Sequence, residues 1–163
     1  MARTFPVDII CRMSTIKLDL DELKARVGSH LGYSNWHTVT QETINLFAQA
    51  TYDYQWIHVD PERAKAGPFG TTIAHGYYTL SLTPSLLDEI VAYEGARMVV
   101  NYGLNRVRFP APVPVGSKLR CGARVESVEP VEGGCQIVLK LTFEVEGAAK
   151  PCCVADYVSR YYT

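Results

Sequence analysis

The chain has 163 residues, and 47% of them are hydrophobic, so it is long enough to bury the core of one compact domain. Its formal net charge of −1 excludes a global positive field of the kind that attracts nucleic acid or an anionic membrane. It has no uninterrupted run of about 18 apolar residues, so no membrane-spanning helix is expected. The short apolar stretch near the N-terminus is broken by Asp8 and lacks a signal-peptide core, which favours a cytoplasmic protein.

The first part of the chain predicts short elements. Residues 1–18 show no regular pattern and are expected to form an N-terminal arm. A short helix is predicted over residues 21–31, where leucine and valine recur on one side, and a brief strand over residues 35–40. Thr40 has the side chain of an N-cap residue for a helix over residues 41–50.

The middle of the chain is expected to carry a loop and two helices. The loop covers residues 51–59 and is followed by the helix-start pair Asp60–Pro61, which opens a helix of one or two turns. The most apolar helix is predicted over residues 76–93, and Pro84 predicts a kink or a break within it.

After Gly95 the hydrophobic pattern changes to a period of two, which is typical of strands. Four long strands are predicted, over residues 97–109, 117–129, 135–146 and 151–162. Turn residues separate them, so an antiparallel meander is expected. One face of such a sheet must be buried, and the helix over residues 76–93 is the element expected to cover it.

The cysteine pattern predicts neither disulfides nor a metal site. Five cysteines are present, and no two of them form a CxxC pair. They are Cys11, Cys121, Cys135, Cys152 and Cys153. We expect them to be small buried or half-buried residues in a reducing compartment. No His/Cys cluster has the spacing of metal ligands, and neither a Walker loop nor a GxGxxG motif occurs.

The segment from Tyr52 to Gly76 carries the candidate catalytic residues. Asp53 and His58 lie five positions apart and could share one water molecule. A carboxylate orients water or receives a proton, and imidazole titrates near neutrality, so the pair suits acid–base chemistry. Gly76 opens the apolar helix, where its backbone N–H could donate to a carbonyl oxygen. An ordinary polar loop and a glycine needed only for a tight turn are the alternatives.

The same segment resembles the signature of the MaoC-like, (R)-specific enoyl-CoA hydratases, also called hydratase 2. The matching residues are Asp53, Ile57, His58, Asp60, Ile73, Ala74, His75 and Gly76. Two longer strings, at residues 55–63 and 101–113, are similar to the NodN-like branch of that family. The resemblance extends from about Gly32 to the C-terminus.

This resemblance implies a fold, an assembly and a reaction. The fold is α+β, a single hot-dog domain over residues 19–163 in which an antiparallel sheet wraps a long central helix. The assembly is a homodimer in which two sheets pair at their edges. The reaction is the hydration of a trans-2-enoyl-CoA to a 3-hydroxyacyl-CoA, or the reverse dehydration, with the coenzyme A thioester as substrate and no cofactor.

The resemblance also implies roles for the candidate residues. His58 would take a proton from water, Asp53 would orient that water or exchange its proton, and the N–H of Gly76 would stabilise the enolate oxygen. Which group protonates the alpha carbon stays open, as do the acyl chain length and the choice between CoA and an acyl-carrier protein. His75 is expected to hold the turn by a hydrogen bond.

Further residues are candidates for substrate binding, each with a plainer alternative. Tyr52 stands where the family usually has glycine, so its ring would narrow the pocket, redirect the substrate or point outward. Gln55 would hold the active loop in shape, and Trp56 would form a wall or pack. Tyr77 and Leu80 would lie along the acyl chain.

Two basic rims could contact the phosphates of CoA. Arg106 and Arg108 share one face of a predicted strand, where the alternative is a solvated edge. Arg63 and Lys65 offer a second candidate rim.

Two other functions are compatible with the sequence. The first is a hot-dog acyl-CoA thioesterase, which would use a carboxylate to drive hydrolysis. Against it, the first turns of the long helix hold no Asp or Glu, and Asp88 and Glu89 come late in it. The second is an accessory protein that binds acyl-CoA without catalysis, if Tyr52 blocks the site. Nucleic acid and membranes are not expected as partners.

Overall fold

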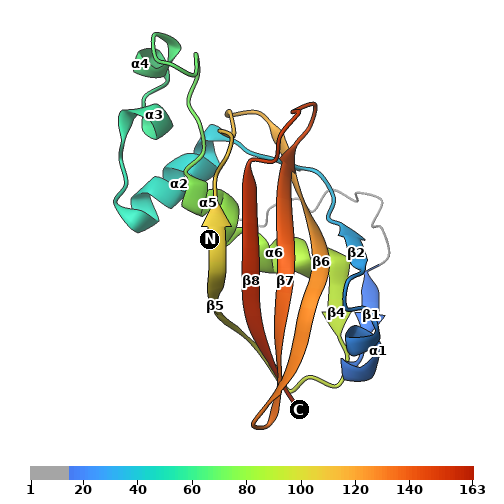
Figure 1. Ribbon diagram of the computed structural model, residues 1–163. Coiled ribbons are helices and arrows are strands. Elements are labelled where there is room, and N and C mark those ends of the chain that lie inside the picture. The colour runs from blue at the N-terminus through green and yellow to red at the C-terminus, as the bar shows by residue number, and fades with distance from the viewer. Residues whose placement is uncertain (1–14) are drawn as a thin grey trace, which may run out of the picture.

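Figure 1 shows the computed structural model, which describes residues 15–163. A large curved sheet forms one part of the molecule, and a group of short helices extends beyond one end of that sheet. Most of the predicted N-terminal arm, residues 1–14, lies outside the described residues. The arm's residues 16–18 are not irregular: they form strand β1 (Ile16–Leu18), which pairs in parallel with β4 (Val91–Tyr93).

The large sheet has six strands in the antiparallel order β2–β6–β7–β8–β5, and β3 also pairs with β6. The strands are β2 (His30–Tyr33), β3 (His37–Thr38), β5 (Met98–Arg108), β6 (Lys118–Val131), β7 (Gly134–Val145) and β8 (Cys153–Tyr162). The predicted meander is correct for β6, β7 and β8 but wrong for β5, which pairs with β8 at the edge of the sheet.

The connection between β5 and β6 explains this difference. It carries Pro110, Pro112 and Pro114, whose missing N–H groups do not suit a tight hairpin. The segment instead crosses the end of the sheet, where the N–H of Ala74 donates to the carbonyl of Val113 at 2.8 Å. The remaining edge of β6 is occupied by β2 and β3, so β5 pairs elsewhere.

The central helix is broken, as Pro84 predicts. It consists of α5 (Gly76–Ser81) and α6 (Thr83–Ile90), with Pro84 in the first turn of α6. The last part of the predicted helix is strand β4 instead. Leu86, Leu87 and Ile90 of α6 are buried in the main hydrophobic cluster together with the inward side chains of the sheet. A sheet wrapped around a central helix is the α+β hot-dog arrangement, so the predicted fold class is confirmed.

The helices before the site differ from the prediction in length. Helix α1 (Leu20–Ala25) is shorter than the predicted helix over residues 21–31. It stops because Gly28 adopts a positive φ of 84°, after which the chain enters β2. Helix α2 (Gln41–Thr51) begins as predicted, with the hydroxyl of Thr40 accepting the N–H of Thr43 at 3.2 Å.

Two further helices belong to the segment that carries the candidate site. They are α3 (Trp56–Val59), which lies in the predicted loop, and α4 (Pro61–Lys65). Helix α4 begins as predicted, because the carboxylate of Asp60 accepts the N–H of Arg63 at 3.0 Å. Together α2, α3 and α4 project beyond the end of the sheet beside β5 (Figure 1).

The cysteines within the described residues are buried and free, as expected. They are Cys121, Cys135, Cys152 and Cys153, and Cys11 lies outside the described range. Burial raises the pKa of the Cys152 thiol to about 12, so this thiol is a poor nucleophile at neutral pH. Within residues 15–163, no helix is long and apolar enough to span a bilayer.

Candidate active site

The segment with Asp53 begins at a sharp change of chain direction. Tyr52 ends α2 in the left-handed conformation, with φ 61° and ψ 20°. Residues other than glycine adopt this region rarely, and at a helix end glycine is the usual choice. Glycine, which the resemblance implies at this position, would adopt this conformation without strain. The Tyr52 side chain is 84% exposed, so it points outward and does not block a pocket.

His58 is held from two sides. It lies on α3 with only 6% of its surface exposed. Its Nδ1–H donates to the carbonyl of Ile73 at 2.7 Å, since a carbonyl oxygen can only accept. The side-chain amide of Gln41 donates to the backbone carbonyl of His58 at 2.8 Å. The neutral His58 ring therefore keeps a free lone pair on Nε2, which is the atom that a general base needs.

The environment of His58 favours this neutral form. Burial is the largest influence and lowers the pKa of the imidazole below its usual value of 6.5. The nearby His75 lowers this pKa further, whereas the hydrogen bond to Ile73 and the charge of Asp53 raise it. Because the net shift of the pKa is downward, His58 is uncharged at neutral pH and can accept a proton.

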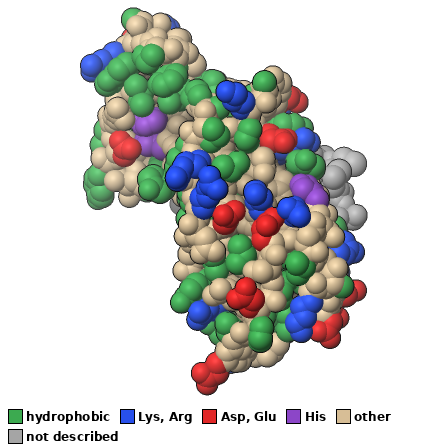
Figure 2. Space-filling model, viewed as in Figure 1, with side chains coloured by type: hydrophobic (Ala, Val, Ile, Leu, Met, Phe, Trp, Pro, Cys, Tyr) green, Lys and Arg blue, Asp and Glu red, His purple; other side chains and the backbone are tan. Residues whose placement is uncertain are grey.

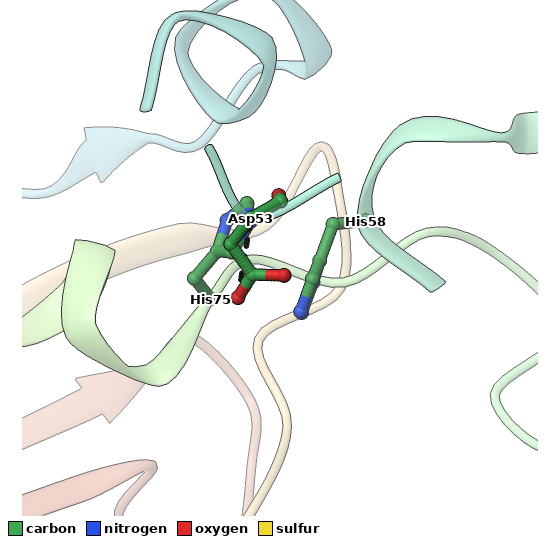
Figure 3. A group of neighbouring side chains, drawn as sticks. All are labelled: Asp53, His58 and His75. Atoms are coloured by element: carbon green, nitrogen blue, oxygen red, sulfur yellow. Dashed lines mark hydrogen bonds and ion pairs between the residues drawn. The ribbon is translucent and has the colours of Figure 1, made fainter. Parts of the chain in front are cut away.

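Asp53, His58 and His75 converge on one point, as Figure 3 shows. One potential ligand atom from each lies within 4.8 Å of those from the other two. A single water molecule can bridge two acceptors at such a separation, because each of its hydrogen bonds spans about 2.8 Å. The predicted convergence of Asp53 and His58 on one water molecule is thus geometrically possible.

Within residues 15–163, the same three side chains bring together potential ligand atoms that could surround a cation. Their spacing in the sequence did not predict a metal site. However, Nε2 of His75 already donates to the backbone carbonyl of Asp53 at 3.0 Å. Coordination through that nitrogen would cost this hydrogen bond. The free Nε2 of His58 and the Asp53 carboxylate suit proton transfer without such a loss.

A cavity of about 290 Å³ opens next to His58. Gly76 lies on its wall at the start of α5, where backbone N–H groups of a helix are not used within the helix. An added Cβ at Gly76 would lie 3.0–3.1 Å from ring atoms of Phe109, so a larger residue here would require that ring to shift. Thr79 and Cys152 also line the cavity. In Figure 2 an acidic side chain lies next to histidine over the part of the molecule formed by α2, α3 and α4, with hydrophobic side chains nearby.

The other predicted binding residues do not line this cavity. Tyr77 is 70% exposed and does not line the cavity, although its ring makes an edge contact with Phe109, which does. Leu80 is half-buried against the core. Trp56 packs on Arg63, whose guanidinium carbon lies 4.5 Å from the ring centroid, and Gln55 is exposed at the start of α3.

Arg106 and Arg108 share one face of β5, as predicted. They lie opposite Asp156 and Val154 of β8, on the face that alternates with the buried Ala155. That face points away from α6, and neither arginine lines the cavity of its own chain. Their role as a rim for CoA phosphates stays a prediction.

Sequence reasoning missed Gln41, which connects three segments of the site. Besides its bond to His58, it accepts the hydroxyl of Thr72 at 2.5 Å and donates to Asn45 at 2.8 Å. Thr72 directly precedes Ile73, the residue whose carbonyl holds the His58 ring. The partners His58 and Thr72 are 17 and 31 positions away in the chain, so no local pattern could have indicated this role.

Comparison with known proteins defines the class of this protein. The family model described as MaoC like domain matches residues 22–146, and the chain belongs to this MaoC-like dehydratase family. A protein of Mycobacterium tuberculosis named 3-hydroxyacyl-thioester dehydratase Z is 55% identical over 141 residues, covering 86% of this chain and 93% of that protein.

Two further similarities support the same class. Nodulation protein N of Rhizobium leguminosarum bv. viciae is 43% identical over 147 residues, covering 88% of this chain and 91% of that protein, which confirms the resemblance to the NodN-like branch. The X-ray structure of the monoamine oxidase regulatory protein from Archaeoglobus fulgius covers 84% of this chain and 90% of its own, with a TM-score of 0.73 and 26% identity.

Proposed function

We propose that this MaoC-like dehydratase adds water to a trans-2-enoyl thioester to form an (R)-3-hydroxyacyl thioester, or catalyses the reverse dehydration. The observation that carries the proposal is the pairing of a neutral, fixed His58 with the Asp53 carboxylate beside a cavity. The names of the relatives, which include a 3-hydroxyacyl-thioester dehydratase, favour the same reaction.

The proposed chemistry balances without an oxidant or a reductant. Nε2 of His58 takes a proton from the water held between it and Asp53, and the oxygen of that water bonds to C3 of the alkene. The electron pair of the double bond moves toward the thioester carbonyl and forms an enolate. A proton delivered to C2 then completes the hydration: it is the one that His58 took from the water, and it reaches C2 either directly from His58 or after transfer to Asp53.

The enolate needs a hydrogen-bond donor at its oxygen. The N–H of Gly76 is the candidate, because it belongs to the first turn of α5 and lies on the cavity wall. A donor that is fixed before the reaction stabilises developing charge better than reorganising water does, and its removal typically costs about 3 kcal/mol of activation free energy.

We further propose that two copies assemble through β5. This strand pairs with β8 on one side, and within residues 15–163 its other edge has no partner. Its exposed apolar side chains include Met98, Val100, Tyr102 and Leu104. An unpaired, apolar edge strand favours pairing with another strand. Sedimentation or light scattering would measure the mass, and a monomer at micromolar concentration would reject this assembly.

The same proposal has three further parts. The substrate is a coenzyme A thioester, the reaction requires no cofactor, and the protein is cytoplasmic. Adding water to a polarised alkene is not a redox step, so the residues described are chemically sufficient. If activity disappears on dialysis against a chelator and returns with a divalent cation, the cofactor-free part of the proposal is wrong.

The thioesterase alternative is less well supported. It requires a carboxylate at the start of the central helix, and neither α5 nor α6 has an acidic residue in its first turn. The accessory-protein alternative depended on a Tyr52 ring inside the pocket, whereas that ring is exposed.

Incubation with crotonyl-CoA separates these functions. A hydratase removes the absorbance of the conjugated enone without releasing a free thiol. Release of the thiol would indicate a thioesterase, and binding without either change would indicate an accessory protein. Chiral analysis of the product tests the (R) configuration, and an (S) product would contradict that part of the proposal.

A further inference from the structure

His75 has no role in the reaction described above, although it lies beside both residues of the pair. It precedes α5 as its N-cap residue, but its side chain makes no capping hydrogen bond. Only 3% of its surface is exposed. A buried imidazole that does not cap its own helix must find its hydrogen bond elsewhere.

The first contact of His75 is with the backbone of Asp53. Its Nε2–H donates to the Asp53 carbonyl at 3.0 Å, across 22 positions of sequence. The acceptor is a carbonyl oxygen, so Nε2 carries the hydrogen. Nδ1 of the same ring is buried and has no hydrogen-bond partner within the described residues. The single hydrogen bond of this ring is thus directed to the residue that carries the carboxylate.

The second contact is with the ring of His58. The two imidazoles are stacked, with centroids 3.8 Å apart and planes inclined by 25°. Phe47 of α2 contacts the His75 ring as well, with a centroid distance of 5.1 Å. His75 is therefore braced by α2 and supports the His58 ring, whose rotation is also limited by the Nδ1–H bond to Ile73.

We propose that His75 is a positioning residue that aligns both Asp53 and His58 through its hydrogen bond to the Asp53 backbone and its stacking on the His58 ring. The inference rests on the hydratase function proposed above. Asp53 needs such support, because it follows the left-handed Tyr52 and is itself exposed. Its carboxylate lies 4.0 Å from Nε2 of His75, too far for a direct hydrogen bond, so the hold acts through the backbone.

Two substitutions separate the parts of this role. In His75→Phe the aromatic ring stays and the N–H donor is lost. In His75→Gln the side-chain amide offers a donor near the former Nε2 and the ring is lost. Tyr78→Phe on the same helix is a matched control, because it removes one hydrogen bond, from the Tyr78 hydroxyl to Thr43 at 3.1 Å, without touching Asp53 or His58.

The expected result is a loss of turnover with little loss of binding. For His75→Phe, kcat should fall roughly 10- to 100-fold while KM changes less than about threefold, because misplaced groups act on the transition state. His75→Gln should recover at least a part of that loss, and Tyr78→Phe should keep normal turnover. Thermal unfolding of each variant shows whether its fold survives.

Crystal structures of the two His75 variants test the positioning itself, whether or not the wild-type protein turns over crotonyl-CoA. The inference is supported if the Asp53 backbone shifts in His75→Phe, which loses the N–H donor, and if the His58 ring turns in His75→Gln, which loses the stacked ring. Unchanged geometry or a normal kcat in His75→Phe overturns the inference. An equal loss of kcat in His75→Phe, His75→Gln and Tyr78→Phe overturns it as well. A wild-type protein that leaves the enone intact rejects the proposed function separately.

Discussion

The sheet with α6 and the segment from residue 52 to residue 76 are organised by different forces. The sheet is a continuous antiparallel ladder whose inward side chains, such as Leu139 and Phe143, are fully buried. The site segment has one-turn helices and is held by single hydrogen bonds. In one of them Gln41 donates to the carbonyl of His58, and in another the His58 ring donates to the carbonyl of Ile73. Stability therefore depends mainly on the first region, and the geometry of the reaction depends on a few polar contacts in the second.

The largest expected effect on activity comes from the catalytic pair. His58→Gln and Asp53→Asn should each lower the hydration rate at least about 100-fold, the scale of one acid–base group. Both variants should still fold, because neither side chain belongs to the hydrophobic cluster, but His58→Gln should lower the unfolding temperature more than Asp53→Asn, since only His58 is buried and bonded to Ile73. Kinetics with crotonyl-CoA and thermal unfolding measure the two quantities. His37→Gln is the control, because His37 lies on β3 and pairs with Glu89 of α6, outside the site. Near-normal turnover in either catalytic variant contradicts the assignment.

The core should show the opposite pattern. Leu139→Ala should lower the free energy of unfolding by about 2–5 kcal/mol, because it leaves a cavity in a fully buried region. Among molecules that remain folded, kcat should stay near normal. Denaturant unfolding and active-site-normalised kinetics measure these values. A large loss of kcat with intact stability would show that the two regions are not separable.

Gln41 tests how strongly the site depends on its distant contacts. Gln41→Ala should lower kcat about tenfold, because the backbone of His58 and the Thr72 segment lose their shared partner. Gln49→Ala on the exposed part of the same helix is the matched control. Equal activities in the two variants would mean that Gln41 only stabilises α2.

The pH dependence should reflect the lowered pKa of His58. Because the neutral form is the base, kcat/KM should persist as pH falls through about 6.5, the usual imidazole pKa, and decline about tenfold per unit only at lower pH. The unfolded chain binds this proton more readily, so the contribution of His58 to stability is present above about 6.5 and is lost as pH falls toward the lowered pKa. A decline of kcat/KM that begins well above pH 6.5 would disagree with the burial of the ring.

The smallest effect is expected at Tyr52. Tyr52→Gly should relieve a left-handed conformation that costs about 1–2 kcal/mol, against an entropic cost of about 0.5–1 kcal/mol for the glycine. A net stabilisation of a few tenths to about 1 kcal/mol follows from these values. Activity should stay within about twofold, because remote exposed groups contribute little to the transition state. A large rise in turnover would show that the ring obstructs substrate.

Predictions that depend on residues close together in the sequence are correct, and those that depend on distant contacts are less often so. The starts of α2 and α4 were predicted correctly, because Thr40 and Asp60 act on N–H groups only three residues away. The break at Pro84 is local in the same sense. The pairing of β5 with β8 was not predicted, because it depends on which sheet edge remains open after β2 and β3 have paired with β6.

By itself, the sequence determined the four long strands, the broken central helix, the family and the segment in which Asp53 and His58 lie, whereas it did not indicate the short strands β1, β2 and β4. These features depend on neighbouring residues and on periodicity, and both are written directly into the chain. Only the tertiary structure decided that His75 and Gln41 hold this pair, that Tyr52 points outward and that the arginines of β5 do not line the cavity. Those facts are set by contacts between residues far apart in sequence, and such contacts exist only once the chain has folded.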